Sequence, residues 1–337
     1  MSPRVAVIVL NWNGQHLLGR CLGALQAQTC RDAEVVLVDN GSTDGSLAFV
    51  RQHFPQVRLI ANSENLGFAA ANNQAIRATD SEFVALLNND TEPAPDWLAE
   101  LLRAADSDER VGACASRMLF AHQPQTINSA GVALDRAAIA WDWRGGEGDD
   151  PAEREPEEVF GACAGAALYR RAMLDDIGLL DEDFFAYLED VDLAWRAQWA
   201  GWRTLSVPTA RVLHLHSATT REGSPFKNRL LGRNKVWLIA KNYPWPHLLC
   251  YLPAILFYDL GALPFVLLWR RDWGPLLGRL EGLAGLGKAL RKRRALRPLR
   301  RLPARTVLAR MAPLAAPWRI WQRYAHLYRD SGGQNGG

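Results

Sequence analysis

An apolar stretch near residue 85 ends in side chains that could bind a metal ion. Residues 83–87 are apolar, and Asn88, Asn89 and Asp90 follow them directly, before a Pro-containing turn. Such a run is typical of a buried strand. Ligands of open α/β sheets bind outside the carboxyl ends of strands, where Asp90 could ligate a hard cation such as Mg²⁺. In the alternative interpretation, these residues only form a turn and cap a helix that starts near Asp96.

Three carboxylates further along the chain could supply a general base. Glu189, Asp190 and Asp192 open a predicted helix that runs to about Ala200 and ends at Gly201. Like charges raise one another's pKa, and this tuning makes a carboxylate a useful base at neutral pH. The alternative is structural, because the helix dipole also favours acidic residues in a first turn.

Two histidines alternate in a short apolar run, residues 212–216. In a strand, His214 and His216 would point to the same side. Imidazole is a frequent metal ligand, although single histidines are also common in protein cores. The run therefore offers either a metal ligand or a packed core residue.

The first ninety residues alternate between predicted strands and helices. The strands cover residues 5–10, 34–39, 57–60 and the run that ends before Asn88, with helices between them, the last at 69–78. This order predicts an α/β fold with a mainly parallel sheet and helices on both faces. Neither G-x-G-x-x-G nor a G-x-x-x-x-G-K-[ST] loop is present. A nucleotide would therefore be held by side chains at several strand ends, together with a metal.

Charge is distributed unevenly over the 337 residues. Residues 1–240 carry 22 Lys and Arg against 32 Asp and Glu, whereas residues 241–337 carry 17 against 4, so the net charges are −10 and +13. We therefore predict an acidic body and a basic tail that meets something anionic. The five scattered cysteines form no C-x-x-C pair, and no signal peptide is recognisable, so a reducing cytosol fits.

Two segments that precede the acidic helix have distinctive compositions. Residues 121–158 are mostly polar and are predicted to form a loop or a short hairpin. Residues 160–169 are mostly small and apolar, which allows the backbone to approach a ligand or a packed neighbour closely.

The tail contains an apolar segment followed by a basic one. Residues 248–269 are apolar except for Asp259 and just reach the ~20 residues of a membrane span, but Pro253 and Pro264 interrupt them. We expect a broken, half-inserted pair of helices. Residues 276–301 combine Leu with many Arg and Lys, which favours a basic amphipathic region on an anionic membrane. A soluble dimerisation arm is the alternative; nucleic acid is not expected, because the acidic body would repel it.

Taken in order, five motifs resemble those of family 2 glycosyltransferases, and among them the bacterial rhamnosyltransferases. They occupy residues 7–13, 38–45, 65–72, 87–90 and 187–193. The resemblance covers roughly residues 4–240. It implies a catalytic domain at residues 1–240 and leaves 241–337 as a basic amphipathic helical tail that is membrane-associated. It implies a Rossmann-like GT-A fold, a nucleotide-diphospho-sugar donor, a divalent cation (Mg²⁺ or Mn²⁺) and an inverting single displacement.

The resemblance also implies roles for single residues. Asp39 matches the acid that pairs with the pyrimidine base, and the other donor-binding candidates are Asn11, Asn13, Gly67, Asn72 and Asn89.

The metal and the base follow in the same way. Asp90 matches the last acid of the D-x-D metal motif, here reduced to one carboxylate, and His214 matches a late metal ligand, with His216 as the competing assignment. Asp190 matches the general base, and Glu189 beside it would orient or contact the acceptor. Residues 121–158 are a candidate lid, because a transferase must exclude water.

The resulting hypothesis is an enzyme at the cytoplasmic face of the cell membrane, peripheral or partly inserted. It transfers a sugar, with rhamnose favoured, from a dTDP- or UDP-sugar to a glycan or lipid-linked acceptor in cell-envelope polysaccharide synthesis. A nucleotidyltransferase would need a Gly-rich basic loop after the first strand, which is missing. The reduced motif at Asn88 to Asp90 keeps open a non-catalytic nucleotide-sugar-binding or scaffold protein at the membrane.

Overall fold

The computed structural model describes residues 2–215, 224–261, 263–268, 270–316 and 319. Its first part alternates as predicted, through β1 (Val5–Asn11), α1 (Gln15–Gln26), β2 (Ala33–Asn40), α2 (Ser46–His53), β3 (Arg58–Asn62), α3 (Phe68–Arg77) and β4 (Phe83–Asn88). The four predicted strands are confirmed to within two residues at each end.

The central sheet continues beyond these strands. The further strands are β5 (Thr91–Pro93), β6 (Val111–Phe120), β7 (Gln123–Ser129), β10 (Glu157–Val159), β11 (Ala166–Arg170) and β12 (Arg203–His214). Within the described residues the order is β10-β12-β6-β11-β4-β1-β2-β3, with β5 beside β12 and β7 beside β6. Parallel pairing joins β3, β2, β1 and β4, and also β6 and β12, whereas β11 is antiparallel to both β4 and β6. The sheet is therefore mainly parallel, as predicted.

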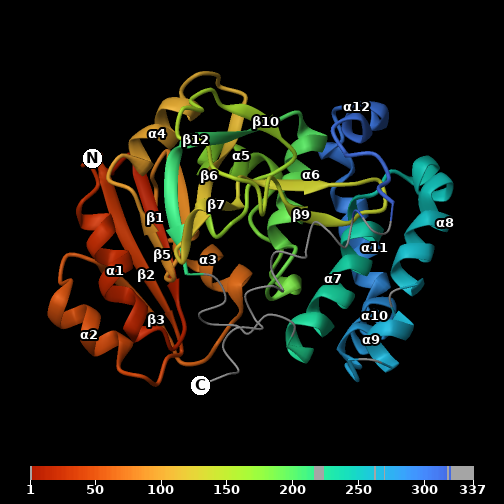
Figure 1. The fold of residues 1–337 in the computed structure, drawn as a ribbon, viewed down its shortest axis with the longest axis horizontal. Helices are drawn as coiled ribbons and strands as arrows, with labels where there is room; N and C mark the ends of the chain where they lie inside the picture. Colours follow the sequence, from red (N-terminus) through yellow and green to blue (C-terminus); the bar gives the residue numbers. More distant parts are fainter. Residues whose placement is uncertain (1, 216–223, 262, 269, 317–318, 320–337) are drawn as a thin grey trace.

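Helices cover both faces of the sheet, as Figure 1 shows. Besides α1 to α3, the helices that pack on the sheet are α4 (Trp97–Ala105), α5 (Arg171–Ile177) and α6 (Glu189–Ala200). Val7 and Val9 of β1 pack in one core with Leu18 of α1, whereas Ile8 packs in the other with Leu193 of α6. Strands buried on both faces form continuous apolar runs, which is why the sequence marks them clearly.

Residues 121–158 hold more structure than a loop. They contain β7 and a separate hairpin of β8 (Val132–Leu134) and β9 (Ala140–Asp142). The acidic run that follows is anchored by Arg117, which is fully buried and pairs with Asp149 at 2.9 Å and with Glu153 at 2.8 Å. Buried charges need such partners, so this run is fixed against β6.

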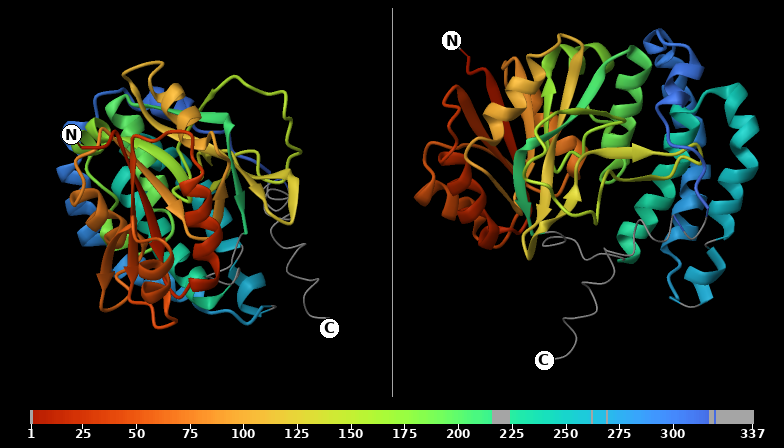
Figure 2. Two further views of the ribbon diagram at one scale, coloured as in Figure 1. Left: turned by 90° about the vertical axis from the view of Figure 1, so that its left-hand side faces the viewer. Right: turned by 45° about the horizontal axis from the view of Figure 1, so that its top comes forward.

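The C-terminal helices gather at one end of the sheet, beside α6 (Figures 1 and 2). They are α7 (Pro225–Asn242), α8 (Trp245–Gly261), α9 (Leu263–Leu268), α10 (Gly274–Ala284), α11 (Leu286–Ala295) and α12 (Ala304–Ala309). One core cluster joins Trp195 of α6 to Leu238, Leu248 and Val307. The division between residues 240 and 241 stays a prediction; α7 runs across it, and both parts contribute to this core.

Many cations of the basic tail pair with acids of the body. Lys288 lies 2.5 Å from Asp183, Lys292 pairs with Asp181 and Asp183, and Arg301 donates to Asp176 at 2.8 Å. Part of the positive charge that predicts an anionic partner is therefore neutralised inside the molecule.

The apolar segment of the tail lies on the outside of this group of helices. Residues Trp245–Leu268 are long and apolar enough to cross a membrane, with a mean hydropathy of 1.7, and little of their surface is buried. Asp259, the charge in this segment, accepts from Lys235 of α7 at 2.9 Å and from Arg279 of α10 at 2.8 Å. The charge therefore ties three helices together.

Candidate active site

Three of the predicted donor-binding residues meet at the carboxyl ends of β1, β2 and β4. Asn11 and Asp39 are register partners, and Asn11 Nδ2 donates to Asp39 Oδ1 at 2.9 Å. Asn89 Nδ2 donates to Asn11 Oδ1 at 2.8 Å. All three side chains are buried. Parallel neighbouring strands place successive strand ends side by side, so the sheet assembles this polar row.

The loops after β1 and β2 are tied to each other through Asn13. Its backbone N–H donates to Ser42 Oγ at 2.8 Å, and its Oδ1 accepts from the N–H of Thr43 at 2.8 Å. Asn13 has a φ of 51°, in the left-handed region that Asn tolerates well. A Cβ at Gly14 would lie 2.2 Å from Asn89 Nδ2, so a side chain at this position would displace the Asn89 amide that donates to Asn11.

Gly67 and Asn72 lie at the start of α3. Gly67 has a φ of 86°, and a Cβ there would lie 2.7 Å from the carbonyl oxygen of Phe185. The glycine thus lets this loop contact the segment that precedes Glu189. Asn72 is buried and donates to the carbonyl of Phe68 at 2.9 Å, within its own helix. Donor binding by Gly67 and Asn72 stays a prediction.

Asp90 and His214 come together, although 124 positions separate them in the sequence. His214 Nε2 lies 3.4 Å from Asp90 Oδ1, and both side chains are largely buried. Leu215 N–H also donates to the carbonyl of Asp90 at 2.9 Å, so β12 and the end of β4 are fixed together. His216 lies outside the described residues.

Asn128 on β7 orients the imidazole. Its Oδ1 lies 2.7 Å from His214 Nδ1. An amide oxygen only accepts, so Nδ1 donates and Nε2 faces the carboxylate of Asp90. A metal-binding histidine typically donates its other N–H in this way. An imidazole nitrogen and a carboxylate oxygen this close together are both common ligands of divalent cations. Sequence reasoning missed Asn128, because its partner is distant along the chain.

The three acids at the start of α6 serve different purposes. Asp190 accepts from the N–H groups of Ala164 at 3.3 Å and Val191 at 2.8 Å, and its side chain is half-buried. Asp192 is fully buried and accepts from the side chains of three residues at 2.8–2.9 Å, namely Arg196, Lys241 and Asn242. The cluster therefore divides into an acid near the strand ends and an acid that joins α6 to α7.

The electrostatics follow this division. Burial raises the pKa of Asp190, and burial together with the charge of Asp190 raises the pKa of Glu189 well above its usual range. Burial also acts on Asp192, but Lys241 and Arg196 outweigh it and lower the pKa of that carboxyl. A raised pKa suits a general base, and Asp192 lacks this property.

A further acid approaches the same place from the β8–β9 hairpin. Burial, with a contribution from the charge of Asp190, raises the pKa of Asp142 to about 6. Asp142 lies in the polar stretch that was predicted to be a lid, and no periodicity in the sequence marks it.

The small residues before β11 connect the end of β4 to Asp190. The N–H of Asn88 donates to the carbonyl of Gly165 at 2.9 Å, and the N–H of Ala164 donates to Asp190. A Cβ at Gly165 would lie 3.3 Å from Asn88 Nδ2. The predicted close backbone approach is confirmed, with a packed neighbour as its partner.

Comparison with known proteins identifies the family of this chain. The family model "Glycosyl transferase family 2" matches residues 6–178. The N-acetylglucosaminyl-diphospho-decaprenol L-rhamnosyltransferase of Mycobacterium tuberculosis (strain ATCC 25618 / H37Rv) is 31% identical over 247 residues, which cover 65% of this chain and 78% of the relative.

Two solved structures share the fold. The mannosyltransferase PcManGT from Pyrobaculum calidifontis, in complex with GDP-Man and Mn²⁺, has a TM-score of 0.51 at 21% identity and covers 97% of this chain and 86% of its own. GalNAc-T7 with UDP, GalNAc and Mn²⁺ has a TM-score of 0.56 at 17% identity, with 71% of this chain and about half of its own, 51%, covered. The fold is thus a GT-A-like α/β fold, and the family match shows that this chain belongs to glycosyl transferase family 2 and is a glycosyltransferase.

Proposed function

We propose that this glycosyltransferase transfers a sugar, with inversion, from a nucleotide-diphospho-sugar to a lipid-linked acceptor in cell-envelope polysaccharide synthesis. The observation that carries the proposal is the placement of Asp190. Its carboxyl has a raised pKa and hydrogen-bonds to Ala164, in the segment that contacts the end of β4. The named relative acts on a diphospho-decaprenol glycan, which supports a lipid-linked acceptor and makes rhamnose, from dTDP-rhamnose, the first sugar to test.

The donor would bind along the strand ends. Asp39 would accept from the pyrimidine base, because its carboxylate is already fixed by Asn11 and by the N–H of Ser42 at 3.0 Å. Asn13 and Asn89 would complete this side of the nucleotide pocket. A preorganised acceptor costs little further ordering when the donor binds.

Asp90 and His214 would hold the divalent cation, with Mg²⁺ or Mn²⁺ as candidates. In the part of the chain that the structure describes, no group of three or more His, Cys, Asp or Glu side chains forms a complete metal site. Cations of this kind commonly use one or two protein ligands together with substrate phosphates. When bound, the cation would neutralise the charge that develops on the leaving nucleoside diphosphate.

Asp190 would act as the general base. The acceptor hydroxyl gives its proton to the Asp190 carboxylate as its oxygen forms a bond to the anomeric carbon. The bond from that carbon to the diphosphate breaks, and the electron pair leaves with the nucleoside diphosphate. Attack from the opposite face inverts the configuration through an oxocarbenium-like state. Glu189 and Asp142 would contact the acceptor or tune the base.

We place the enzyme at the cytoplasmic face of the membrane, bound by the outer surface of α8. Five apolar residues are exposed there at intervals of three and four, which aligns them on one side of the helix: Trp245, Leu249, Leu252, Leu256 and Leu260. Arg270 and Arg271 are exposed after α9 and suit anionic head groups. This surface would bring the site to a lipid-linked acceptor.

The proposal is tested with Asp190→Asn. We expect turnover of the accepted nucleotide-sugar to fall by about 10³-fold or more, because the base is lost, while donor binding in the presence of Mg²⁺ or Mn²⁺ persists. Donors are first identified by thermal stabilisation of the wild type. Full transfer by the variant would refute the base assignment. Donor binding without any transfer by the wild type would favour a non-catalytic nucleotide-sugar-binding protein.

A further inference from the structure

The segment that leads into the base has an unusual backbone. Phe185, Tyr187 and Leu188 have φ values of 64°, 70° and 66°, in the left-handed region that residues with a Cβ rarely occupy. Phe185 also has a ψ of −65°, and the N–H of Ala186 donates to the carbonyl of Phe184 at 2.7 Å. This is a γ-turn of the rare, strained form. Such a backbone persists only where its surroundings hold it.

One side chain of α7 holds most of this segment. Asn234 is fully buried, and its Nδ2 lies 3.0 Å from the carbonyl oxygen of Phe184, 2.9 Å from that of Ala186 and 2.8 Å from that of Tyr187. The three carbonyls converge on one amide group because the turn folds them inward. Without Asn234, these three carbonyls would lose their shared donor.

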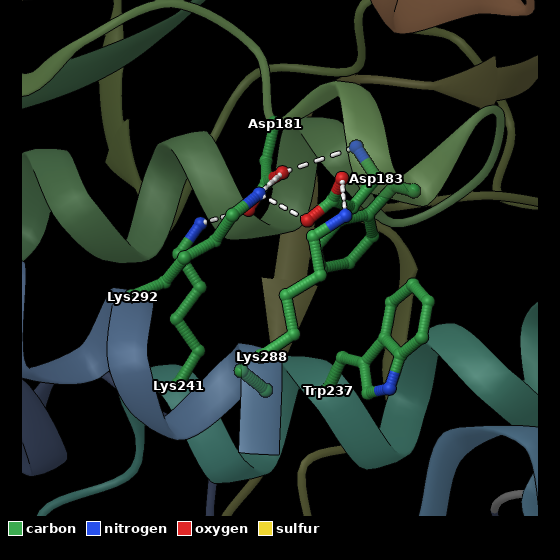
Figure 3. A pocket seen from close by; sticks show the side chains of 8 residues that line it. Asp181, Asp183, Trp237, Lys241, Lys288 and Lys292 are labelled. Carbon is green, nitrogen blue, oxygen red and sulfur yellow. Dashed lines mark hydrogen bonds and ion pairs between the residues drawn. The ribbon is translucent and has the colours of Figure 1, made fainter. Parts of the chain in front are cut away.

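Neighbouring residues of α7 extend the same contact. Arg233 Nη2 donates to the carbonyl of Phe184 at 2.9 Å. One turn of helix further on, Trp237 packs edge-on against the ring of Phe184. Lys241 then pairs with Asp181 at 2.6 Å (Figure 3). It also pairs with Asp192 at 2.8 Å. Helix α7 thus contacts the chain before the base, at the turn, and after the base.

The held segment also reaches the donor side. The carbonyl oxygen of Phe185 accepts from the N–H of Ala69 at 3.2 Å, and Gly67 fits closely against Phe185. The turn therefore lies between the loop at Gly67 and the two acids, Glu189 and Asp190. A change in its backbone would move the base relative to the donor.

We propose that Asn234 is a positioning residue: it holds the strained turn at residues 184–188 so that Asp190 faces the reacting centre. Asn234 touches neither acid, and acts through the backbone that precedes them. The inference rests on the proposed function, because it assigns Asn234 a role in that same reaction.

Asn73 is a matched control. It is also fully buried, and it holds the same chain just before the turn, through Leu180 O at 2.8 Å, Glu182 Oε1 at 2.9 Å and Leu180 N at 3.1 Å. It contacts no residue of the strained turn in these bonds. Asn73→Ala removes a buried amide with three hydrogen bonds, and Asn234→Ala removes one with four, the fourth from Arg233 Nε to Asn234 Oδ1 at 3.0 Å, so both should lower the melting temperature.

The two variants should differ in catalysis. For Asn234→Ala we expect kcat to fall by about 100-fold with the donor KM changed by less than about threefold, because misplacement of a base weakens the transition state and leaves the donor site intact. For Asn73→Ala we expect kcat within about threefold of the wild type. Equal kcat values for the two variants would overturn the proposal.

A second measurement does not depend on turnover. Hydrogen exchange at the amides of residues 185–188 should become at least about tenfold faster in Asn234→Ala and stay unchanged in Asn73→Ala. Unchanged hydrogen exchange in Asn234→Ala would also overturn the proposal. If the wild type transferred no sugar, only the proposed function would be refuted. If Asn234→Ala fails to fold, Arg233→Met is the alternative, because it removes a donor to the carbonyl of Phe184 and should also lower kcat. An unaltered kcat in Arg233→Met would then refute the proposal that α7 positions the turn.

Discussion

Glu189 and Asp190 are adjacent, yet only one of them reaches a polar partner on both oxygens. The Oδ atoms of Asp190 accept from two backbone N–H groups, whereas the buried Oε2 of Glu189 accepts from no group among the described residues. Burial and the charge of Asp190 therefore favour the protonated form of Glu189. A buried carboxyl of this kind is a stability cost that a catalytic site tolerates.

This cost leads to a prediction about Glu189→Gln. A carboxyl whose folded pKa exceeds its unfolded value stabilises the protein below the unfolded pKa, about 4.3 for Glu, and loses that contribution as pH rises through the folded pKa. Gln cannot ionise, so the variant should be more stable than the wild type at pH 7, by on the order of 1 kcal/mol. Denaturant unfolding at pH 4 and pH 7 measures the difference.

An exposed acid provides the control. Glu109→Gln should change the free energy of unfolding by less than about 0.5 kcal/mol at either pH, because Glu109 is solvated. If the free energy of unfolding of the wild type, relative to that of Glu189→Gln, increased between pH 4 and pH 7, the raised pKa of Glu189 would be contradicted. Transfer activity of Glu189→Gln should fall, since the acceptor loses a contact beside the base.

Helices α7, α8 and α10 depend on one another through Asp259. Its carboxylate accepts from Lys235 and Arg279, and all three side chains are about five-sixths buried, with 16–17% of their surface exposed. Removing one member of a buried ion-pair group leaves the others uncompensated, which costs more than the pair contributes.

Asp259→Asn should therefore lower the free energy of unfolding by about 2 kcal/mol, because Lys235 and Arg279 would face each other without an anion. Thermal or denaturant unfolding at pH 7 measures this. Arg103→Gln is the matched control, since its pair with Glu100 is 2.7 Å long but Arg103 is 71% exposed, and we expect less than about 0.5 kcal/mol. Equal losses in the two variants would show that the Asp259 group is solvated.

Local pattern predicted the elements, and long-range pairing decided what their charged residues do. β1 to β4, α3 and α6 follow from apolar runs and turn residues, which are properties of neighbouring positions. The sequence alone presents Asp259 as a charge in a membrane segment, because its partners, Lys235 and Arg279, lie 24 and 20 positions away. It also presents Asp192 as part of one cluster with Asp190, because Lys241, which pairs with Asp192, lies 49 positions further on.

The candidate site shows the same division. Asp39, Asp90 and Asp190 could be predicted because each follows or opens a recognisable element. Asn128 and Asp142 could not, because the residues they act on, His214 and Asp190, lie 86 and 48 positions further along the chain. The contacts between supporting residues and site residues therefore become visible only in the folded sheet.

At the scale of the molecule, acids of the sheet-containing part pair with cations of the C-terminal helices across the junction between them. The apolar surface of α8 faces away from this junction. The core cluster that includes Trp195, Leu238 and Val307 crosses this junction. Deleting the tail would expose that core, so a truncated protein could lose membrane binding merely by unfolding. Substitutions of exposed apolar residues on α8 test the membrane proposal more directly, because they leave the core intact.

We predict that the wild type floats with anionic vesicles and that Leu249→Glu combined with Leu260→Glu abolishes flotation. Leu249 and Leu260 are 66% and 54% exposed, so the protein should stay folded, which its melting temperature checks. Burial of such a side chain contributes about 1.5–3 kcal/mol, so the two changes should weaken vesicle binding by more than about 100-fold. Leu314→Glu is the control, because Leu314 is also exposed, at 40%, but lies outside α8–α10. Equal flotation of all three proteins would exclude α8 as the membrane surface, and flotation with neutral vesicles alone would exclude the role of Arg270 and Arg271.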